Sequence, residues 1–198
     1  MDVAGTNTAA DRLGRALTRA EDWHSGQVRK GSTIPYLSHL MSVASLVMED
    51  GGDQDQVIAA LLHDAAEDQG GEATLAAIKD EFGPRVESIV RACSDSLETD
   101  PTMKADWHTR KRAAIANFAS ESTDALVVSA ADKLHNLRST VLDLSLIGDS
   151  VWDRFKTGRE GFLWYHDEVL AVLQQRIPDS RSVRAFAIEM ADLHTQMG

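Results

Sequence analysis

The sequence is poor in cysteine and proline. It contains one cysteine, Cys93, and four prolines among its 198 residues. A single cysteine cannot form a disulfide within the chain, which excludes the disulfide-stapled small secreted domains and fits a reducing cytoplasm. The prolines, Pro35, Pro84, Pro101 and Pro178, stand where loops or helix starts are expected, so long helices can form between them.

The sequence also lacks long apolar runs and an excess of positive charge. No apolar run approaches the roughly 20 residues that cross a bilayer, and the opening MDVAGTNTAADR lacks the basic start and apolar stretch of a signal peptide. We therefore expect a cytoplasmic protein without a membrane partner. The net charge of −11 argues against broad, phosphate-driven binding to nucleic acid. An anionic substrate would need a local basic patch.

Apolar residues recur at helical spacing along most of the chain, as in ALVVSAADKLHNL and RVESIVRAC, and no stretch alternates as a strand does. We therefore expect an all-α fold. No repeat or linker marks a second unit, which favours a single domain over residues 1–198 with residues 178–198 as a C-terminal packing helix. Helices are expected near 8–23, 36–49, 54–69, 74–82, 84–94, 104–119, 122–147, 150–176 (with a break) and 181–196, with a polar loop at 95–103.

Four ionisable residues stand together in AALLHDAAEDQGG, residues 59–71, directly after an apolar run. On one continuous helix, His63, Asp64, Glu67 and Asp68 would share the face opposite the apolar stripe. Such a face is typical of an amphipathic helix with a solvated side. It could also supply half of the ligands of a metal site, because neighbouring carboxylates repel each other and a cation relieves that repulsion.

The remaining ligands of a metal site are found elsewhere in the chain. His39 lies on the preceding helix, and Asp132 interrupts the apolar run of ALVVSAADKLHNL. A carboxylate buried there would be costly unless it is paired or bound to a metal. Two imidazoles and two carboxylates without a thiolate suit one divalent ion, Mn²⁺ before Fe²⁺, Co²⁺, Ni²⁺ or Zn²⁺. Asn136 is one turn after Asp132 and on the same face.

The order His39, His63-Asp64, Asp132 resembles the HD superfamily of metal-dependent phosphohydrolases. More narrowly, HSGQVRKGSTIPYLSH, AALLHDAAED, FGPRVESIVRACSD and ADKLHNLR resemble the hydrolase domain of RelA/SpoT homologues and its single-domain relatives, the small alarmone hydrolases. The similarity is strongest over residues 20–140. It implies an HD-type helical bundle.

The resemblance also implies roles for individual residues. His39, His63, Asp64 and Asp132 would hold the metal. Glu67 and Asp68 match the family's catalytic acid pair, which orients or deprotonates the attacking water and assists the leaving group.

The basic pair Arg29 and Lys30, in VRKG, matches the family's phosphate-binding pair and is the local basic patch that an acidic protein needs. Asn136 is expected to contact the ribose or base, and Tyr165 is a candidate for stacking on a purine. Lys133 is expected on the side of its helix away from the site. Two positions depart from the family pattern, Leu40 after the first histidine and Gln69 after the acid pair.

The activity that the resemblance implies is removal of the 3′-pyrophosphate from a guanosine or adenosine alarmone, with a purine nucleotide as the binding partner. One alternative keeps the phosphohydrolase and changes the substrate to a nucleoside monophosphate or a phosphorylated nucleotide cofactor. Another is a neutralising, antitoxin-like partner of an alarmone synthetase. No synthetase motif is present in the sequence.

Overall fold

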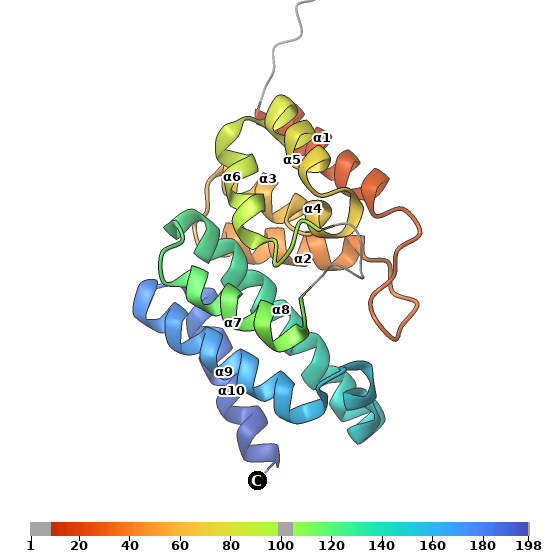
Figure 1. Ribbon diagram of the computed structural model, residues 1–198, viewed down its shortest axis with the longest axis vertical. Helices are drawn as coiled ribbons and strands as arrows, with labels where there is room; N and C mark the ends of the chain where they lie inside the picture. Colours follow the sequence, from red (N-terminus) through yellow and green to blue (C-terminus); the bar gives the residue numbers. More distant parts are fainter. Residues whose placement is uncertain (1–8, 99–104, 198) are drawn as a thin grey trace, which may run out of the picture.

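The structure is a computed structural model that describes residues 9–98 and 105–197, and all regular elements in that part of the chain are helices (Figure 1). An isolated antiparallel bridge joins Val28 to Pro35. The helices are α1 (Ala9–Trp23), α2 (Leu37–Glu49), α3 (Gln54–Leu62), α4 (Ala65–Gln69), α5 (Glu72–Phe82), α6 (Pro84–Cys93), α7 (Trp107–Phe118), α8 (Thr123–Ile147), the 3₁₀ helix η1 (Gly148–Arg154), α9 (Gly158–Arg176) and α10 (Arg181–Met197).

The all-α expectation is confirmed, and most helix boundaries lie within three residues of the expected ones. Capping by nearby side chains explains where several of the helices begin. Asp53 and Gln56 form a reciprocal capping box at α3, and Asp106 and Ser122 cap α7 and α8. The break expected within 150–176 is observed between η1 and α9. Residues 99–103 of the expected loop lie outside the described part.

The expectation of one continuous helix over 54–69 was wrong. The chain forms α3 and α4, separated by a turn at His63 and Asp64. The Nδ1 atom of His63 lies 2.8 Å from the Ala60 carbonyl oxygen, so this side chain folds back on the last turn of α3. Both residues keep φ and ψ in the right-handed helical region, and the His63 Nε2 atom lies 3.0 Å from Asp64 Oδ2.

Helix α8 is the central element of the described structure. It runs between α2, α3 and α6 above and α9 and α10 below in the view of Figure 1. One face, with Ala125, Val128 and Ala131, packs into a cluster formed with α1, α2, α3, α5 and α6. Another, with Leu134 and Leu137, packs into a second cluster with η1, α9 and α10. Asp132 lies midway along this doubly covered helix.

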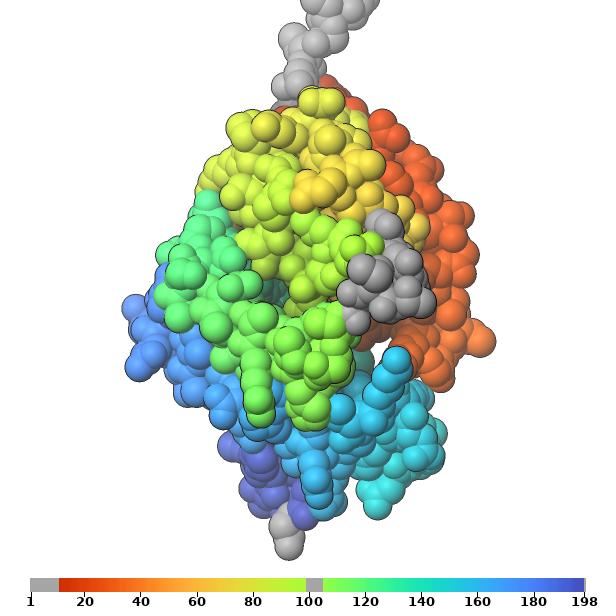
Figure 2. Space-filling view, in the orientation of Figure 1, coloured from red at the N-terminus to blue at the C-terminus, as the bar shows by residue number. Residues whose placement is uncertain are grey.

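None of the helices within residues 9–98 and 105–197 combines the length and the apolar character that crossing a bilayer requires. In the space-filling view, α7 covers the face on which the upper and lower helices meet, directly below α6 (Figure 2).

Candidate metal centre

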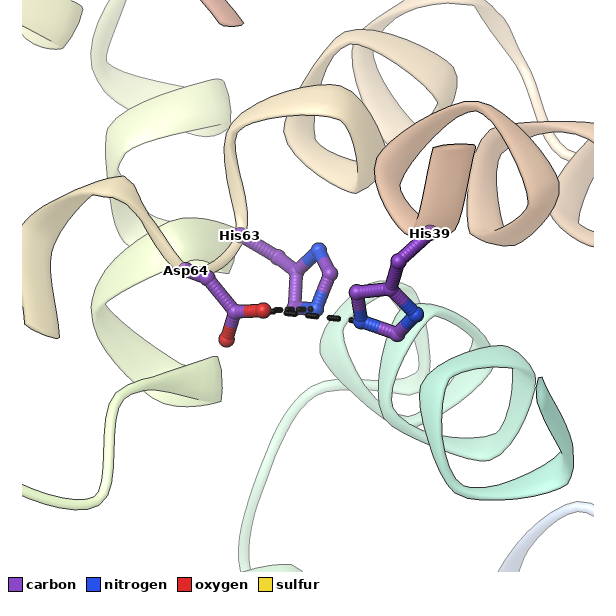
Figure 3. A group of neighbouring side chains, drawn as sticks. All are labelled: His39, His63 and Asp64. Atoms are coloured by element: carbon purple, nitrogen blue, oxygen red, sulfur yellow. Dashed lines mark ion pairs between the residues drawn. The ribbon is translucent and has the colours of Figure 1, made fainter. Parts of the chain in front are cut away.

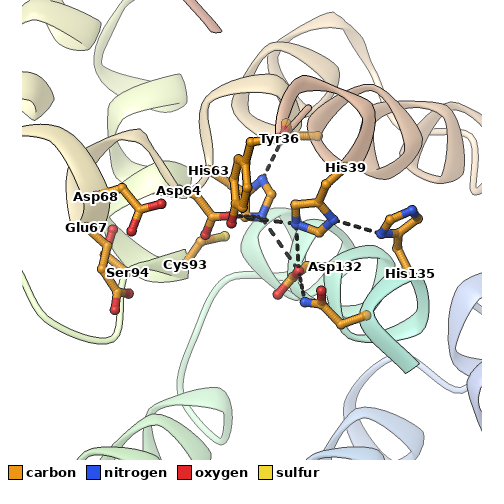
Figure 4. A network of polar contacts seen from close by, with 12 residues as sticks. Tyr36, His39, His63, Asp64, Glu67, Asp68, Cys93, Ser94, Asp132 and His135 are labelled. Atoms are coloured by element: carbon orange, nitrogen blue, oxygen red, sulfur yellow. Dashed lines mark hydrogen bonds and ion pairs between the residues drawn. The ribbon is translucent and has the colours of Figure 1, made fainter. Parts of the chain in front are cut away.

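Four side chains converge at one point in the protein (Figure 4), and three of them are drawn alone in Figure 3. His39 comes from the first turn of α2, His63 and Asp64 come from the turn between α3 and α4, and Asp132 comes from the middle of α8. The predicted ligand set is therefore brought together.

The donor atoms have the spacing of ligands around a single ion. The Nε2 atom of His39 lies 3.5 Å from Asp64 Oδ2 and 3.2 Å from Asp132 Oδ1. The Nε2 atom of His63 lies 3.0 Å and 3.7 Å from the same two oxygens. Adjacent ligands at about 2.0–2.2 Å from one metal lie roughly 3–3.5 Å apart. Donor atoms of His39, His63 and Asp64 all lie within 4.8 Å of one another. Asp132 Oδ1 lies beside both imidazole nitrogens.

The buried nitrogen of His63 is the feature that a metal explains best. Its Nε2 is fully buried and makes no hydrogen bond within the described residues, although carboxylate oxygens lie beside it. Its Nδ1 faces the Ala60 carbonyl at 2.8 Å and must carry the proton, because a carbonyl only accepts. Nε2 is then the nitrogen available to a metal, and it faces the carboxylate oxygens of Asp64 and Asp132.

The charges at the centre call for a cation. Burial by itself would lower the pKa of His63, but the carboxylates of Asp64 and Asp132 raise this pKa well above its usual value. Burial would raise the pKa of Asp64, yet His63 and His39 hold it well below the ordinary range. Because the carboxylates remain ionised and stabilise positive charge in this position, a divalent ion would replace the proton on the His63 imidazole.

Outer contacts fix the orientation of the candidate ligands. The Nδ1 atoms of His39 and His135 are 2.8 Å apart, and the Tyr36 hydroxyl donates to Asp64 Oδ2 over 2.6 Å. Such partners hold metal-binding side chains in one orientation. His135 was not singled out by the sequence analysis, although its position three residues after Asp132 is a usable signal.

The environment of Asp132 differs from the expectation at one residue. Lys133 was expected to face away from the site, but its Nζ lies 2.6 Å from Asp132 Oδ2. Its long stem lets the ammonium reach back around the helix. Burial would raise the pKa of Asp132, but the Coulomb attraction of this ammonium, followed by the nearby imidazoles of His39 and His63, holds this pKa well below its usual range. Asn136 donates to Asp132 Oδ1 over 2.5 Å.

The acid pair lies beside the centre on α4 (Figure 4). The Glu67 Oε2 atom accepts from the Asp95 backbone N–H over 2.9 Å, and burial followed by the Asp95 charge raises the pKa of Glu67. Asp68 is exposed and its Oδ2 accepts from the Gln27 side chain over 2.8 Å. One acid is thus half-buried and the other is exposed.

The basic pair lies on a tight turn that precedes α2. The turn is closed by hydrogen bonds from the N–H of Ser32 to the carbonyl of Arg29 and from the N–H of Arg29 to the carbonyl of Ile34. The Arg29 guanidinium donates to Asn136 Oδ1 over 2.7 Å, which ties the turn to α8. Lys30 is exposed, with its ammonium 5.6 Å from the centre of the Phe155 ring.

The structure contradicts the assignment of Tyr165 to base stacking. Its side chain is only 5% exposed and belongs to the cluster beneath α8. The ring is covered by Trp107 and by the ammonium of Lys111, 4.7 Å from its centre. No face of the ring is open to a purine.

A small polar cavity lies on the α7 side of the centre. Its volume is about 40 Å³, and it is bordered by His63, Cys93, Ser129, Asp132 and Lys133. Figure 2 shows a hollow where α6 and α7 meet. A polar cavity of this size accommodates water.

The HD domain family model matches residues 16–162, which include all four converging side chains. This match covers most of the chain. The chain belongs to the HD domain family.

Within the HD family, its relatives include enzymes of alarmone metabolism. It is 34% identical over 157 residues to the guanosine-3′,5′-bis(diphosphate) 3′-pyrophosphohydrolase MESH1 of Xenopus tropicalis, covering 78% of this chain and 80% of that protein. It is also 34% identical over 125 residues to a probable GTP pyrophosphokinase of Mycobacterium leprae, covering 63% of this chain. The matched part corresponds to only 15% of the length of that relative, which is a much longer protein.

A solved structure shows the same arrangement of helices. A metazoan ortholog of SpoT, described as hydrolysing ppGpp, superposes with a TM-score of 0.72 at 25% identity, covering 94% of this chain and 96% of that one. The expected resemblance to single-domain alarmone hydrolases is therefore confirmed at the level of family and fold.

Proposed function

We propose that this protein is a metal-dependent hydrolase that removes the 3′-pyrophosphate from guanosine alarmones of the (p)ppGpp type. The observation that carries the proposal is the convergence of His39, His63, Asp64 and Asp132, whose imidazole nitrogens lie 3.0 to 3.7 Å from the carboxylate oxygens. The proposal is supported by the extent of the similarity. The matches span most of MESH1 and of the SpoT ortholog, and are therefore not confined to one motif.

The four converging residues hold one divalent ion in this proposal. Two imidazole and two carboxylate donors favour Mn²⁺, with other divalent transition metals as competitors. When bound, the ion supplies Lewis acidity toward phosphate oxygens and lowers the pKa of a coordinated water. The cavity beside His63 and Asp132 provides room for water at the centre.

Glu67 is the residue best placed to exchange protons with water. Its raised pKa brings its proton affinity closer to neutral pH than that of an exposed glutamate, which favours a general base that later returns the proton. In the reaction, a water oxygen bonds to the phosphorus next to the ribose and the bond from that phosphorus to the 3′ oxygen breaks. One water proton is taken up by Glu67, and the 3′ oxygen leaves with a proton delivered from the side of Asp68.

The basic turn binds the phosphates. Arg29 offers a planar guanidinium and Lys30 an exposed ammonium, and both are on the same turn before α2. Guanidinium and ammonium groups together neutralise a multiply charged phosphate chain. The hydrogen bond from Arg29 to Asn136 holds the turn beside α8, so we propose Asn136 as a contact for the ribose or base.

Two wider predictions follow from this activity. The enzyme would act as one domain in the cytoplasm, where a free thiol such as Cys93 is stable. It would also remove the product of an alarmone synthetase, which is the basis for proposing an antitoxin-like pairing with such an enzyme.

The test is release of pyrophosphate from a nucleotide panel. Metal-stripped protein supplied with Mn²⁺ is incubated with 3′-pyrophosphorylated guanosine and adenosine nucleotides, nucleoside monophosphates and a 3′-phosphorylated cofactor. The proposal expects pyrophosphate from the first group and loss of that release in Asp64→Asn. Orthophosphate from the other substrates alone would keep the metal centre and replace the substrate. No turnover with metal bound would favour the binding-partner alternative.

A further inference from the structure

The side-chain amide of Gln27 contacts three residues at the edge of the metal centre. Its Oε1 lies 2.8 Å from His24 Nδ1 and accepts from Gln69 Nε2 over 3.1 Å. Its Nε2 donates to Asp68 Oδ2 over 2.8 Å. The amide therefore connects the segment after α1 to two neighbouring residues of α4.

The direction of this amide is set by its partners. A Gln69 amide nitrogen can only donate, so the atom of Gln27 that faces it must be the carbonyl oxygen. The NH₂ group of Gln27 then faces Asp68, whose Oδ2 accepts from it. A flipped Gln27 amide would place its NH₂ against the NH₂ of Gln69 and its oxygen against the Asp68 carboxylate, so both of these contacts would be lost.

The backbone and a buried ring hold Gln27 in place. Its N–H donates to the His24 carbonyl over 3.0 Å, and its carbonyl accepts from the Tyr36 N–H over 2.9 Å. The His24 ring is 3% exposed and stacks on Tyr36 with centroids 5.1 Å apart. Tyr36 in turn donates to Asp64. The support of Gln27 is thus continuous with the support of the metal centre.

We propose that Gln27 is a positioning residue for Asp68, and that Gln69 fixes the direction of the Gln27 amide. This inference rests on the proposed function, in which Asp68 handles the proton of the leaving group. A neutral amide is suited to the task, because it orients a carboxylate without the strong lowering of proton affinity that a lysine or arginine would cause. Gln69, one of the two departures from the family pattern, thereby acquires a role.

The first test is a double-mutant cycle on pyrophosphate release. Gln27→Leu keeps the size of the side chain and removes both amide contacts. We expect it to lower kcat about 10-fold, within the range found for residues that orient active groups, and to change KM by less than about twofold. In an Asp68→Asn background the same substitution should cause no further loss, because Gln27 acts through the carboxylate.

Matched variants separate positioning from general damage. Gln69→Ala should lower kcat less than Gln27→Leu, because it leaves the bond to Asp68 in place. Gln175→Leu, at an exposed position near the end of α9, should leave kcat unchanged. An equal loss from Gln27→Leu with and without the Asp68 carboxylate, a change in KM alone, or no change in kcat would each overturn the inference.

A second readout does not depend on turnover. The side-chain NH₂ resonances of Gln27, assigned by their disappearance in Gln27→Leu, should shift in Asp68→Ala and in Gln69→Ala. Unchanged resonances in Asp68→Ala would overturn the contact. If the wild-type protein released no pyrophosphate while these shifts were observed, the proposed function would fail and the positioning of Asp68 would stand.

Discussion

A methyl group added at Gly31 should displace the basic turn that carries Arg29 and Lys30. Gly31 has φ +72°, in the left-handed region. A Cβ built on it would lie 2.5 Å from Arg154 Nε and 2.8 Å from Arg154 Cδ. Arg154 is itself held by an ion pair with Asp143 on α8. Gly31→Ala therefore strains the backbone of the turn and pushes it against η1.

The magnitude follows from these two effects. A left-handed backbone costs a non-glycine residue about 1–2 kcal/mol. Moving the arginine away weakens an ion pair whose partners are 20% and 32% exposed, which adds at most about 1 kcal/mol. If substrate binding has to restore the turn, a cost of about 2 kcal/mol raises KM about 30-fold. Because Glu67 and Asp68 are not part of the turn, kcat should change little.

The assay is the KM for pyrophosphate release, measured for a small set of variants. Gly31→Ala combined with Arg154→Ala should recover part of the lost affinity, because the steric contact is removed and the backbone strain remains. Gly51 has φ +83° with nothing within 4 Å of its Cβ position, so Gly51→Ala is the control for strain alone and should lower stability without changing KM. A wild-type KM in Gly31→Ala, or an equal rise in Gly51→Ala, would refute the reasoning.

Three further substitutions test other parts of the structure. Asp132→Asn removes a charged donor and should lower Mn²⁺ affinity at least about 100-fold, and full retention of metal after dialysis would contradict this. Burial lowers the pKa of His166 to about 4 from its usual 6.5, so the folded state resists protonation and its stability should fall by about 2 kcal/mol between pH 7 and pH 5. In His166→Phe the urea midpoint should fall less between pH 7 and pH 5, because the contribution of His166 is removed. A fall as large as in the wild-type protein would contradict this assignment to His166. Asp53→Ala removes the capping box of α3 and should cost about 1 kcal/mol, seen as a melting temperature about 2–4 °C lower with kcat retained, whereas an unchanged melting temperature would show that the cap contributes nothing.

The sequence was sufficient to predict the helices because their determinants are local. Apolar spacing, the capping residues Asp53, Asp106 and Ser122, and glycine or proline at the boundaries all act within a few residues. The turn at His63 and Asp64 was missed for the opposite reason. Nothing in HDAAED disfavours a helix, and the break becomes useful only when α2 and α8 present their own ligands.

The residues of the metal centre also differ in how well the sequence predicts their positions. His39, His63, Asp64 and Asp132 could be selected from residue type and order, and the structure places them together. The position of Lys133 depends on the reach of a flexible side chain.

Tyr165 shows the same limit. Its burial depends on α7 packing against α9. An aromatic residue in a helix gives the same sequence pattern whether it lines a binding site or packs in the core. Sequence alone therefore could not distinguish the two positions.

The most direct test of the central claim is a metal titration of pyrophosphate release. Metal-stripped protein in chelator-treated buffer is titrated with Mn²⁺ while both bound metal and pyrophosphate release from a 3′-pyrophosphorylated guanosine nucleotide are measured. We expect activity to rise in proportion to bound metal and to saturate at one ion per chain. Full activity of the metal-stripped protein would contradict a metal-dependent hydrolase. Binding of Mn²⁺ to Asp132→Asn with the wild-type affinity would contradict a metal centre built on these four residues.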